Sequence, residues 1–275
     1  MWVFNVLVGK IFVALFLPLL SLGPWAGMIV VSLLTAVLML FVFRLTSNQA
    51  GIKKVKNRIK AHLLEIRLFN DNLGVSLKAQ GNILLANLRY IGYNLRPMLV
   101  MIIPLILILI QLNLWFGSSS LQPGQATMLK MKLEKSRNPL EMQVSVHPTP
   151  NLLLETPPVR IEDEHEISWR LRAIEKGTAS LAITAGSQTF TKEVSVGQKP
   201  LSRISALKPG RRVLDMVLNP GERPLPSGTG IRSVEVIYPS KNMDVFGRGV
   251  HWLIVYFVLS IIFGFALKGF FKVEI

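Results

Sequence analysis

Between two apolar segments of the chain lies a basic one, residues 44–96, RLTSNQAGIKKVKNRIKAHLLEIRLFNDNLGVSLKAQGNILLANLRYIGYNLR. It contains ten Lys and Arg residues but only two acids, Glu65 and Asp71. Lys and Arg in short loops beside membrane spans are retained on the cytoplasmic side of the bilayer. The charge bias therefore predicts that this segment is cytoplasmic and that the apolar segments on either side of it cross the membrane.

The composition of the whole chain is typical of a membrane protein. Hydrophobic residues make up 50% of the 275, and the mean hydropathy of +0.43 is above that of ordinary soluble domains. A helix that crosses a bilayer needs about 20 apolar residues, and the stretches 25–43, 97–116 and 249–267 meet this requirement. The excess of Lys and Arg behind the formal net charge of +15 lies mainly beside these stretches. The orientation of the chain in a membrane explains this position more simply than nucleic-acid binding does.

The first 22 residues are apolar and leave two interpretations open. Lys10 lies in the middle of this segment, and no small-x-small cleavage site follows it, so a cleaved signal peptide is not expected. The segment either lies in the outer membrane interface as a helix, with Lys10 reaching the headgroups, or crosses the bilayer as a first transmembrane helix. Because nothing basic would hold the N-terminus inside, the interfacial helix is favoured.

Apolar residues within the basic segment repeat at the alternating spacing of three and four that is typical of a coiled coil. On the first arm they are Ile52, Val55, Ile59, His62, Ile66, Phe69 and Leu73, and on the returning arm they are Leu77, Gly81, Leu84, Leu88, Ile91 and Leu95. Turn-forming Asn70, Asp71, Asn72 and Gly74 lie between the arms. We therefore predict a cytoplasmic antiparallel coiled-coil hairpin whose two apolar seams face each other.

Residues 117–247 have a different character, with Gly, Pro and Ser at short intervals and alternating apolar and polar residues between them. This alternation predicts short strands near 126–133, 142–147, 167–174, 179–184, 188–196, 213–218 and 231–238. Short strands separated by frequent turns predict an antiparallel β-sandwich, Ig-like in outline. Because residues 44–96 are expected to be cytoplasmic, this domain is expected on the extracytoplasmic side.

The predicted fold class is an α-helical membrane protein with three spans and an N-terminal interfacial helix, a cytoplasmic antiparallel coiled-coil hairpin and an inserted extracytoplasmic all-β sandwich. The expected organisation is an interfacial (or first transmembrane) helix at 1–22, a transmembrane helix at 25–44, the hairpin at 45–96, a transmembrane helix at 97–116, the β-sandwich at 117–247, a transmembrane helix at 249–268 and a cytoplasmic tail at 269–275.

The sequence contains no motif for a catalytic nucleophile, a phosphate-binding loop or a zinc protease. No catalytic residue is therefore expected, and an enzyme is the least favoured class. The absence of cysteine excludes disulfides and Cys-based metal or redox sites. The acidic run at 162–166 is more typical of a solvated loop than of a cation site, so we expect neither a metal nor another cofactor.

Amide side chains near the second apolar stretch raise the question of a polar path into the membrane. Asn87 and Asn94 lie seven residues apart on the returning arm, on either a solvated helix face or a polar track. Gln111 and Asn113 lie within the stretch itself, either at the outer interface or facing a cavity. A buried amide in lipid is unfavourable unless it is paired, so each pair is a candidate functional feature.

The segments RLTSNQAGIKKVK (44–56) and LRPMLVMIIPLILILIQL (95–112), with the hairpin between them, resemble the YidC/Oxa membrane insertase superfamily. The resemblance is closest to the archaeal branch and to subunit 3 of the ER membrane protein complex, and it covers residues 25–116. The matching positions are Arg44, Leu45, Thr46, Gln49, Lys53, Lys56, Arg96, Pro97 and Met98.

The resemblance implies a cytoplasm-facing hydrophilic groove among the membrane helices, which accepts short or weakly hydrophobic membrane segments. Two features depart from the family plan. Bacterial insertases carry an arginine inside the first core helix, whereas residues 25–43 hold no charge and Arg44 lies at their edge. The β-sandwich between the second and third spans is also foreign to that plan.

These features lead us to expect a membrane-protein insertase or chaperone-like protein, with the groove built from the three spans. The candidate residues for the substrate groove or for capture are Gln49, Asn87, Asn94, Arg96, Gln111 and Asn113, and the basic arm consists of Lys53, Lys54, Lys56, Arg58 and Lys60. The alternative is a non-catalytic membrane assembly factor or complex subunit that binds a protein partner through the extracytoplasmic β-domain.

The expected partners follow from these two functions. They are the lipid bilayer, nascent or membrane-protein substrates, and a protein partner at the β-domain. No nucleic acid is expected apart from indirect contact with a ribosome through the basic arm. The expected location is the prokaryotic plasma (inner) membrane, with the hairpin and the C-terminus in the cytoplasm.

Overall fold

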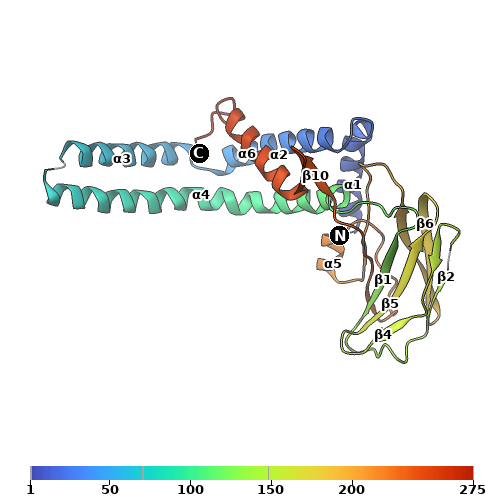
Figure 1. Ribbon diagram of the computed structural model, residues 1–275. Helices are drawn as coiled ribbons and strands as arrows, with labels where there is room; N and C mark the ends of the chain where they lie inside the picture. The colour runs from blue at the N-terminus through green and yellow to red at the C-terminus, as the bar shows by residue number, and fades with distance from the viewer. Residues whose placement is uncertain (1, 70, 148, 275) are drawn as a thin grey trace. The chain divides into compact units, whose positions relative to one another are not determined.

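The computed structural model describes residues 2–69, 71–147 and 149–274, with side chains from residue 6 onward. The chain divides into two compact units, a helical unit of residues 28–108 and 253–275 and a β unit of residues 1–27 and 109–252. Long helices make up the first unit and short strands most of the second (Figure 1). The predicted combination of a helical part with an inserted β-rich domain is therefore confirmed at this level.

Three helices carry the apolar stretches: α2 (Pro24–Thr46), α4 (Leu73–Phe116) and α6 (Trp252–Leu267). Among the described residues, α2 and α4 are long and apolar enough to cross a membrane. Helix α6 has 16 residues, because the residues before it form strand β11 (Arg248–His251). At 1.5 Å per residue it covers about 24 Å, less than the ~30 Å hydrocarbon core. The third span therefore stays a prediction.

Helix α4 joins two parts that the sequence pattern separates. The boundary expected between residues 96 and 97 lies inside a helix of 44 residues that contains both Pro97 and Pro104. Proline removes one backbone donor but fixes φ near the helical value, and the residues on both sides are good helix formers. The returning arm of the hairpin and the second apolar stretch are therefore one continuous helix.

The first arm of the hairpin is α3 (Gln49–Leu68), which lies beside α4 (Figure 1). The side chain of Asn48 caps α3 by accepting a hydrogen bond from the Gly51 amide at 2.9 Å. The side chain of Asn72 caps α4 in the same way, accepting from the Val75 amide at 3.2 Å. Such caps satisfy amides that the first turn of a helix leaves unpaired, so asparagines set the start of both arms.

The seam predicted for the returning arm is wrong. Ile52 of α3 is buried as expected, but Leu84 and Leu88 of α4 are 65% and 60% exposed. Helix α4 instead buries Ala79 and Ala86, which lie on its opposite side at 3.6 residues per turn. Helix α3 therefore faces the alanine side of α4 and leaves the leucine face uncovered.

Two antiparallel sheets and a separate hairpin form the β unit. The larger sheet has the strand order β3-β5-β1-β9-β8, with β4 paired to β5, and the smaller has the order β2-β6-β7. The strands of these two sheets are β1 (Ala126–Leu133), β2 (Val144–His147), β3 (Leu152–Leu154), β4 (Val159–Ile161), β5 (Glu166–Ala173), β6 (Gly177–Ala185), β7 (Gln188–Val196), β8 (Leu207–Pro209) and β9 (Ile231–Val236). Strand β10 (Asn242–Val245) pairs with β11 in the hairpin.

One hydrophobic core receives side chains from both sheets. Trp169 of β5, Leu181 of β6 and Val234 of β9 all lie in it. Alternate residues of β1 are buried, as expected for a strand with one face toward a core. Most strands expected from alternation are therefore present, and the core between two antiparallel sheets agrees with the predicted sandwich.

The strand expected at 213–218 is wrong, because these residues form helix α5 (Val213–Leu218). Its sequence, VLDMVL, has one polar residue and no true alternation. Asp215 in the first turn favours a helix because its charge complements the positive N-terminal end. The Asn219 amide donates to the Asp215 carbonyl at 3.0 Å and ends the helix.

The N-terminal helix α1 (Trp2–Phe16) belongs to the β unit. The Phe16 ring lies 4.7 Å from the Trp115 ring and 5.7 Å from the Phe116 ring, measured between centroids, at the C-terminal end of α4. These ring contacts attach α1 to the end of α4 within the β unit. The choice between an interfacial helix and a first transmembrane helix stays a prediction.

A buried lysine joins the end of α4 to the β unit. Lys241 Nζ donates to the carbonyls of Trp115, at 3.0 Å, and Pro200, and it lies 5.3 Å from the centroid of the Phe116 ring. A cation beside the last carbonyls of a helix is favourable. Burial nevertheless lowers the pKa of Lys241 to about 8, so these carbonyls hold an ammonium that is far easier to neutralise than an exposed one.

The β unit also buries an ion pair. Lys192 is fully buried, and its ammonium contacts the Glu222 carboxylate and donates to the Ser205 carbonyl at 2.7 Å. Lys208 Nζ lies 3.6 Å from the same carboxylate. Desolvation lowers the pKa of Lys192 despite the adjacent carboxylate. Glu222 is therefore the critical member of this group, since its removal would leave the Lys192 ammonium without a counter-charge in an apolar interior and would take the carboxylate from Lys208 as well.

We expect Glu222→Gln to lower the free energy of unfolding by about 3–5 kcal/mol, because it leaves the Lys192 ammonium buried without a counter-charge. The double variant Lys192→Met with Glu222→Gln removes the fully buried pair and should recover part of the loss, the remainder coming from the Lys208 ammonium, which no longer has its carboxylate. Denaturant titration of the full chain in detergent, followed by tryptophan fluorescence, measures both effects. Equal destabilisation of the single and double variants would contradict this account of the pair.

Candidate functional site

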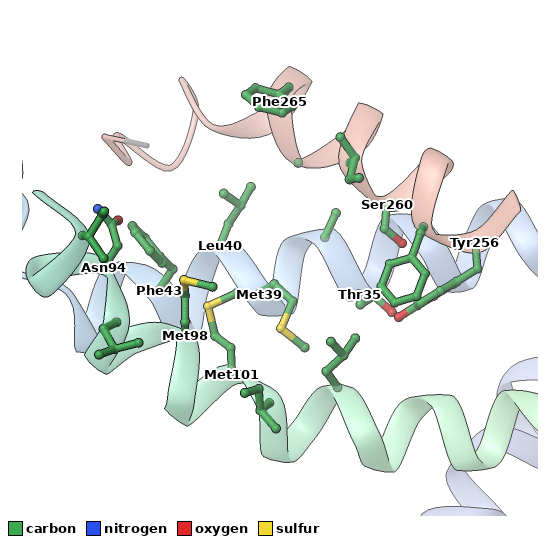
Figure 2. A pocket seen from close by; sticks show the side chains of 18 of the residues that line it. Thr35, Met39, Leu40, Phe43, Asn94, Met98, Met101, Tyr256, Ser260 and Phe265 are labelled. Carbon is green, nitrogen blue, oxygen red and sulfur yellow. The ribbon is translucent and has the colours of Figure 1, made fainter. Parts of the chain in front are cut away.

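The helical unit contains a groove with a volume of about 780 Å³, formed between α2, α4 and α6. All three apolar helices contribute to its walls, as Figure 2 shows. The lining residues are Thr35, Ala36, Met39, Leu40 and Phe43 of α2, Tyr90, Ile91, Asn94, Leu95, Met98, Met101, Ile102 and Leu105 of α4, and Tyr256, Phe257, Ser260, Ile261, Gly264 and Phe265 of α6.

Methionine and aromatic side chains contribute eight of the nineteen lining residues. Met39, Met98 and Met101 lie between α2 and α4, and Phe43 and Phe265 lie toward the same end (Figure 2). Methionine is unbranched and polarisable, so a methionine-rich surface adapts to apolar partners of different shape. The groove can therefore hold an apolar chain segment without requiring one particular sequence.

A few polar groups lie at the other end of the groove. The hydroxyl groups of Thr35, Tyr256 and Ser260 point toward one another there (Figure 2). Tyr256 and Thr35 are buried between the helices. This patch offers hydrogen-bonding groups but no charge, so the groove as a whole has the character of a hydrophobic site with a small polar end.

Two small residues of α6, Ser260 and Gly264, keep the groove open. They follow Tyr256 at a spacing of four and therefore share its helix face. An added Cβ at Gly264 would meet no atom within 4 Å, which places free space directly beside the backbone. Their spacing of four is the sequence feature that indicates this wall.

Of the six residues expected in a groove or in capture, only Asn94 lines this groove. Its amide donates to the Tyr90 carbonyl at 2.7 Å, within its own helix. Asn87 is exposed and donates to the Ile83 carbonyl at 3.0 Å, which is a local bond. Arg96 is exposed and lies outside the lining. These side chains do not assemble into a continuous polar track.

Gln111 and Asn113 lie in the part of α4 that belongs to the β unit. Gln111 is 2% exposed, and a Cβ added at Gly9 of α1 would lie 3.9 Å from its Oε1. Asn113 is exposed near the end of the helix. Of these two amides, Gln111 is thus enclosed at the contact with α1, and neither lines the groove.

Gln49 has a structural role at the opposite end of α2. Its side-chain oxygen accepts a hydrogen bond from the Glu274 amide at 2.7 Å. The Lys56 ammonium lies 3.1 Å from the Glu274 carboxylate, and this hydrogen bond lowers the pKa of that carboxyl. Val273 packs in a cluster with Leu40 and Ile52, so the C-terminal tail is held against the start of the hairpin.

The remaining members of the predicted basic arm stay available to other molecules. Lys53, Lys54, Arg58 and Lys60 are exposed along α3. Lys56 differs because it makes the ion pair with Glu274. The exposed members give one side of α3 a dense positive charge, which attracts acidic peptide or anionic lipid headgroups.

We expect the tail contact to protect Ile52, which is fully buried. In an Ile52→Cys variant, the additional change Val273→Ser should raise the rate of maleimide labelling about ten-fold, because two buried apolar groups worth ~0.8 kcal/mol each are lost. The chain has no cysteine of its own to interfere. The matched control is Val273→Ile, which keeps the contact apolar, and labelling at one rate in all three variants would exclude a protective tail.

In the described part of the chain, no group of three or more His, Asp or Glu side chains gathers as a metal ion would require. Comparison with known proteins finds no matching family model, no matching curated protein and no matching solved structure. The groove, the basic arm and the β unit are thus the features from which a function can be inferred.

Proposed function

We propose that this chain is a membrane-protein insertase or chaperone of the YidC/Oxa type, which holds apolar segments of client proteins in the groove of its helical unit. The observation that carries the proposal is a single groove lined by α2, α4 and α6 together. The family resemblance covers the segments of α2 and α4, and α6 supplies the third wall.

The chemistry of the lining decides which kind of segment fits. A groove lined mostly by Met, Phe, Leu and Ile binds an apolar helix by removing apolar surface from water or from lipid contact, as other helix-in-groove sites do. It differs from the hydrophilic groove that the resemblance implies. The client segments proposed here are therefore apolar helices that need shielding before or during insertion, and the hydroxyl groups near Ser260 would meet an occasional polar residue.

The proposal includes a direction of entry from the cytoplasm. Exposed basic residues along α3 and the excess of Lys and Arg over residues 44–96 favour a cytoplasmic hairpin. In that position the hairpin would collect clients before they reach the bilayer, and the β unit would lie on the extracytoplasmic side of a prokaryotic plasma membrane.

This topology is tested by placing single cysteines at Asp71 in the hairpin turn and Ser187 in the β unit, both of which are exposed. We expect a membrane-impermeant maleimide added outside intact cells to label Ser187→Cys and to leave Asp71→Cys unlabelled, because the charge bias retains the hairpin inside. Labelling of both from outside, or of Asp71→Cys alone, would overturn the proposed direction.

The groove is tested by filling it. In Gly264→Trp the indole would extend into the space beside α6, and we expect insertion of a short-tailed, single-span client to fall on the order of ten-fold, since an occupied pocket excludes a competing apolar group. Protease protection in proteoliposomes measures insertion. The control is Gly269→Trp, five residues further on, at an exposed position outside the lining. Equal activity of the two variants and the unaltered protein would refute a role for the groove.

A second candidate function rests on the β10–β11 hairpin. Phe246 at its turn is 103% exposed and adopts φ = 52°, a left-handed conformation that is uncommon for a bulky residue. An exposed aromatic ring at a hairpin turn fits an assembly factor or complex subunit that binds a protein partner through its β unit. In the insertion assay, loss of activity in Phe246→Ser but not in Gly264→Trp would favour this function over the first.

A further inference from the structure

A continuous apolar stripe runs along α4 into the groove. Its members are Leu77, Leu84, Leu88, Ile91, Leu95, Met98, Ile102 and Leu105, which we call the α4 stripe. From Leu77 to Ile102 each of them is between 44% and 65% exposed. The stripe extends over 29 residues, from Leu77 to Leu105, or about 42 Å of helix.

The spacing within the stripe matches a helical partner. Successive members are separated by 7, 4, 3, 4, 3, 4 and 3 residues, which is the repeat that lets a second helix pack along the first. Helix α3 does not take that place, because it packs on the opposite side, where Ala79 and Ala86 are buried. A membrane interface accepts the same amphipathic repeat, so the choice of a helix as the occupant rests on the continuity of the stripe with the groove.

The stripe is continuous with the groove. Ile91, Leu95, Met98, Ile102 and Leu105 belong both to the stripe and to the groove lining. The members nearer the hairpin turn, such as Leu84 and Leu88, lie before the groove on the same helix face. A helix that packs on them therefore meets the groove without leaving α4.

Basic residues accompany one side of the stripe. Lys78, Arg89 and Arg96 are all exposed and recur at spacings of 11 and 7, which places them on a common side of α4. The sequence of α4 contains no Asp or Glu. A partner helix with acidic residues beside its apolar face would be complementary, whereas a second copy of this basic chain would not be.

We infer that the α4 stripe is a docking track for an apolar client helix with acidic flanking residues, which it passes from the hairpin to the groove. This inference rests on the proposed function, because it names the client segment that the groove would receive. The leucines are exposed in the structure and are not part of a core, so the track can be altered without removing a packing contact of the fold.

The track is tested with a photoreactive amino acid placed at Leu84 or Leu88 of the full chain in proteoliposomes. The client probe is a ribosome-bound chain carrying a helix of leucine and alanine flanked by glutamates, and its counterpart carries lysines instead. Adducts with the glutamate form at both positions, several-fold stronger than with the lysine form, are the expected result. Asn57, exposed on α3, is the control position and should give few adducts.

The photoreactive amino acid is also placed at a fourth position, Met39, which lines the groove from α2. Adducts at this position distinguish failure of the track from failure of the proposed function. Client adducts at Met39 but not at Leu84 or Leu88 would overturn the track and leave the groove intact. Absence of client adducts at all positions would overturn both. Adducts at Leu84 and Leu88 made with a second copy of the chain or with lipid would also overturn the track.

A substitution provides an independent measurement. Leu84→Gln with Leu88→Gln keeps helix-forming residues and should lower client capture at Met39 on the order of ten-fold, since two apolar contacts are lost. The control is Leu63→Gln with Leu64→Gln, because both residues are exposed on α3 and lie outside the stripe. Unchanged helical content by circular dichroism, together with unchanged capture in both variants, would refute the track.

Discussion

The size of a few side chains decides how the helical unit is arranged. Ala79 and Ala86 are the residues of α4 that are buried on the side of α3. The large apolar residues of α4 are turned away from α3. On α6, Ser260 and Gly264 leave space instead of filling it. Small side chains on two helices therefore account for the two features, the alanines of α4 for the uncovered stripe and the small residues of α6 for the groove.

These two features give the proposed function a physical basis that charge alone does not supply. The basic residues of the hairpin attract acidic or anionic molecules over some distance, but such attraction does not select an apolar segment. Selection needs apolar surface that becomes buried on binding. The stripe and the groove provide that surface in sequence along one helix, and the methionines allow it to adapt to different clients.

The β unit is stabilised in a different manner. Its core is a conventional contact of two sheets, yet it also encloses the ammonium groups of Lys192 and Lys241. Lys192 has a carboxylate partner, whereas Lys241 is held by backbone carbonyls at the end of α4. Buried charges of this kind contribute little net stability but make one arrangement far better than its alternatives. Lys241 thus specifies how the end of α4 meets the strands of its own unit.

The sequence patterns predicted which helices and strands form more reliably than they predicted which residues those elements bring together. Long apolar runs, the alternation of β1 and β5, and the turn residues between the hairpin arms depend on interactions within or near the same segment, so a linear sequence contains them. The strand expected at 213–218 failed because a short apolar run fits a helix equally well. Of the expected site residues, only Asn94 reached the groove, because amides bonded within their own helices or at other contacts.

The sequence by itself determined the charge bias, the apolar helices, the antiparallel strands and the heptad repeat of α4, all of which follow from local periodicity. Only the tertiary structure decided which side of that repeat is covered, where the groove opens and which lysines are buried. The physical reason is that burial depends on the neighbour that a side chain meets. A leucine repeat looks the same in sequence whether α3 packs on it or on the alanines of the opposite face.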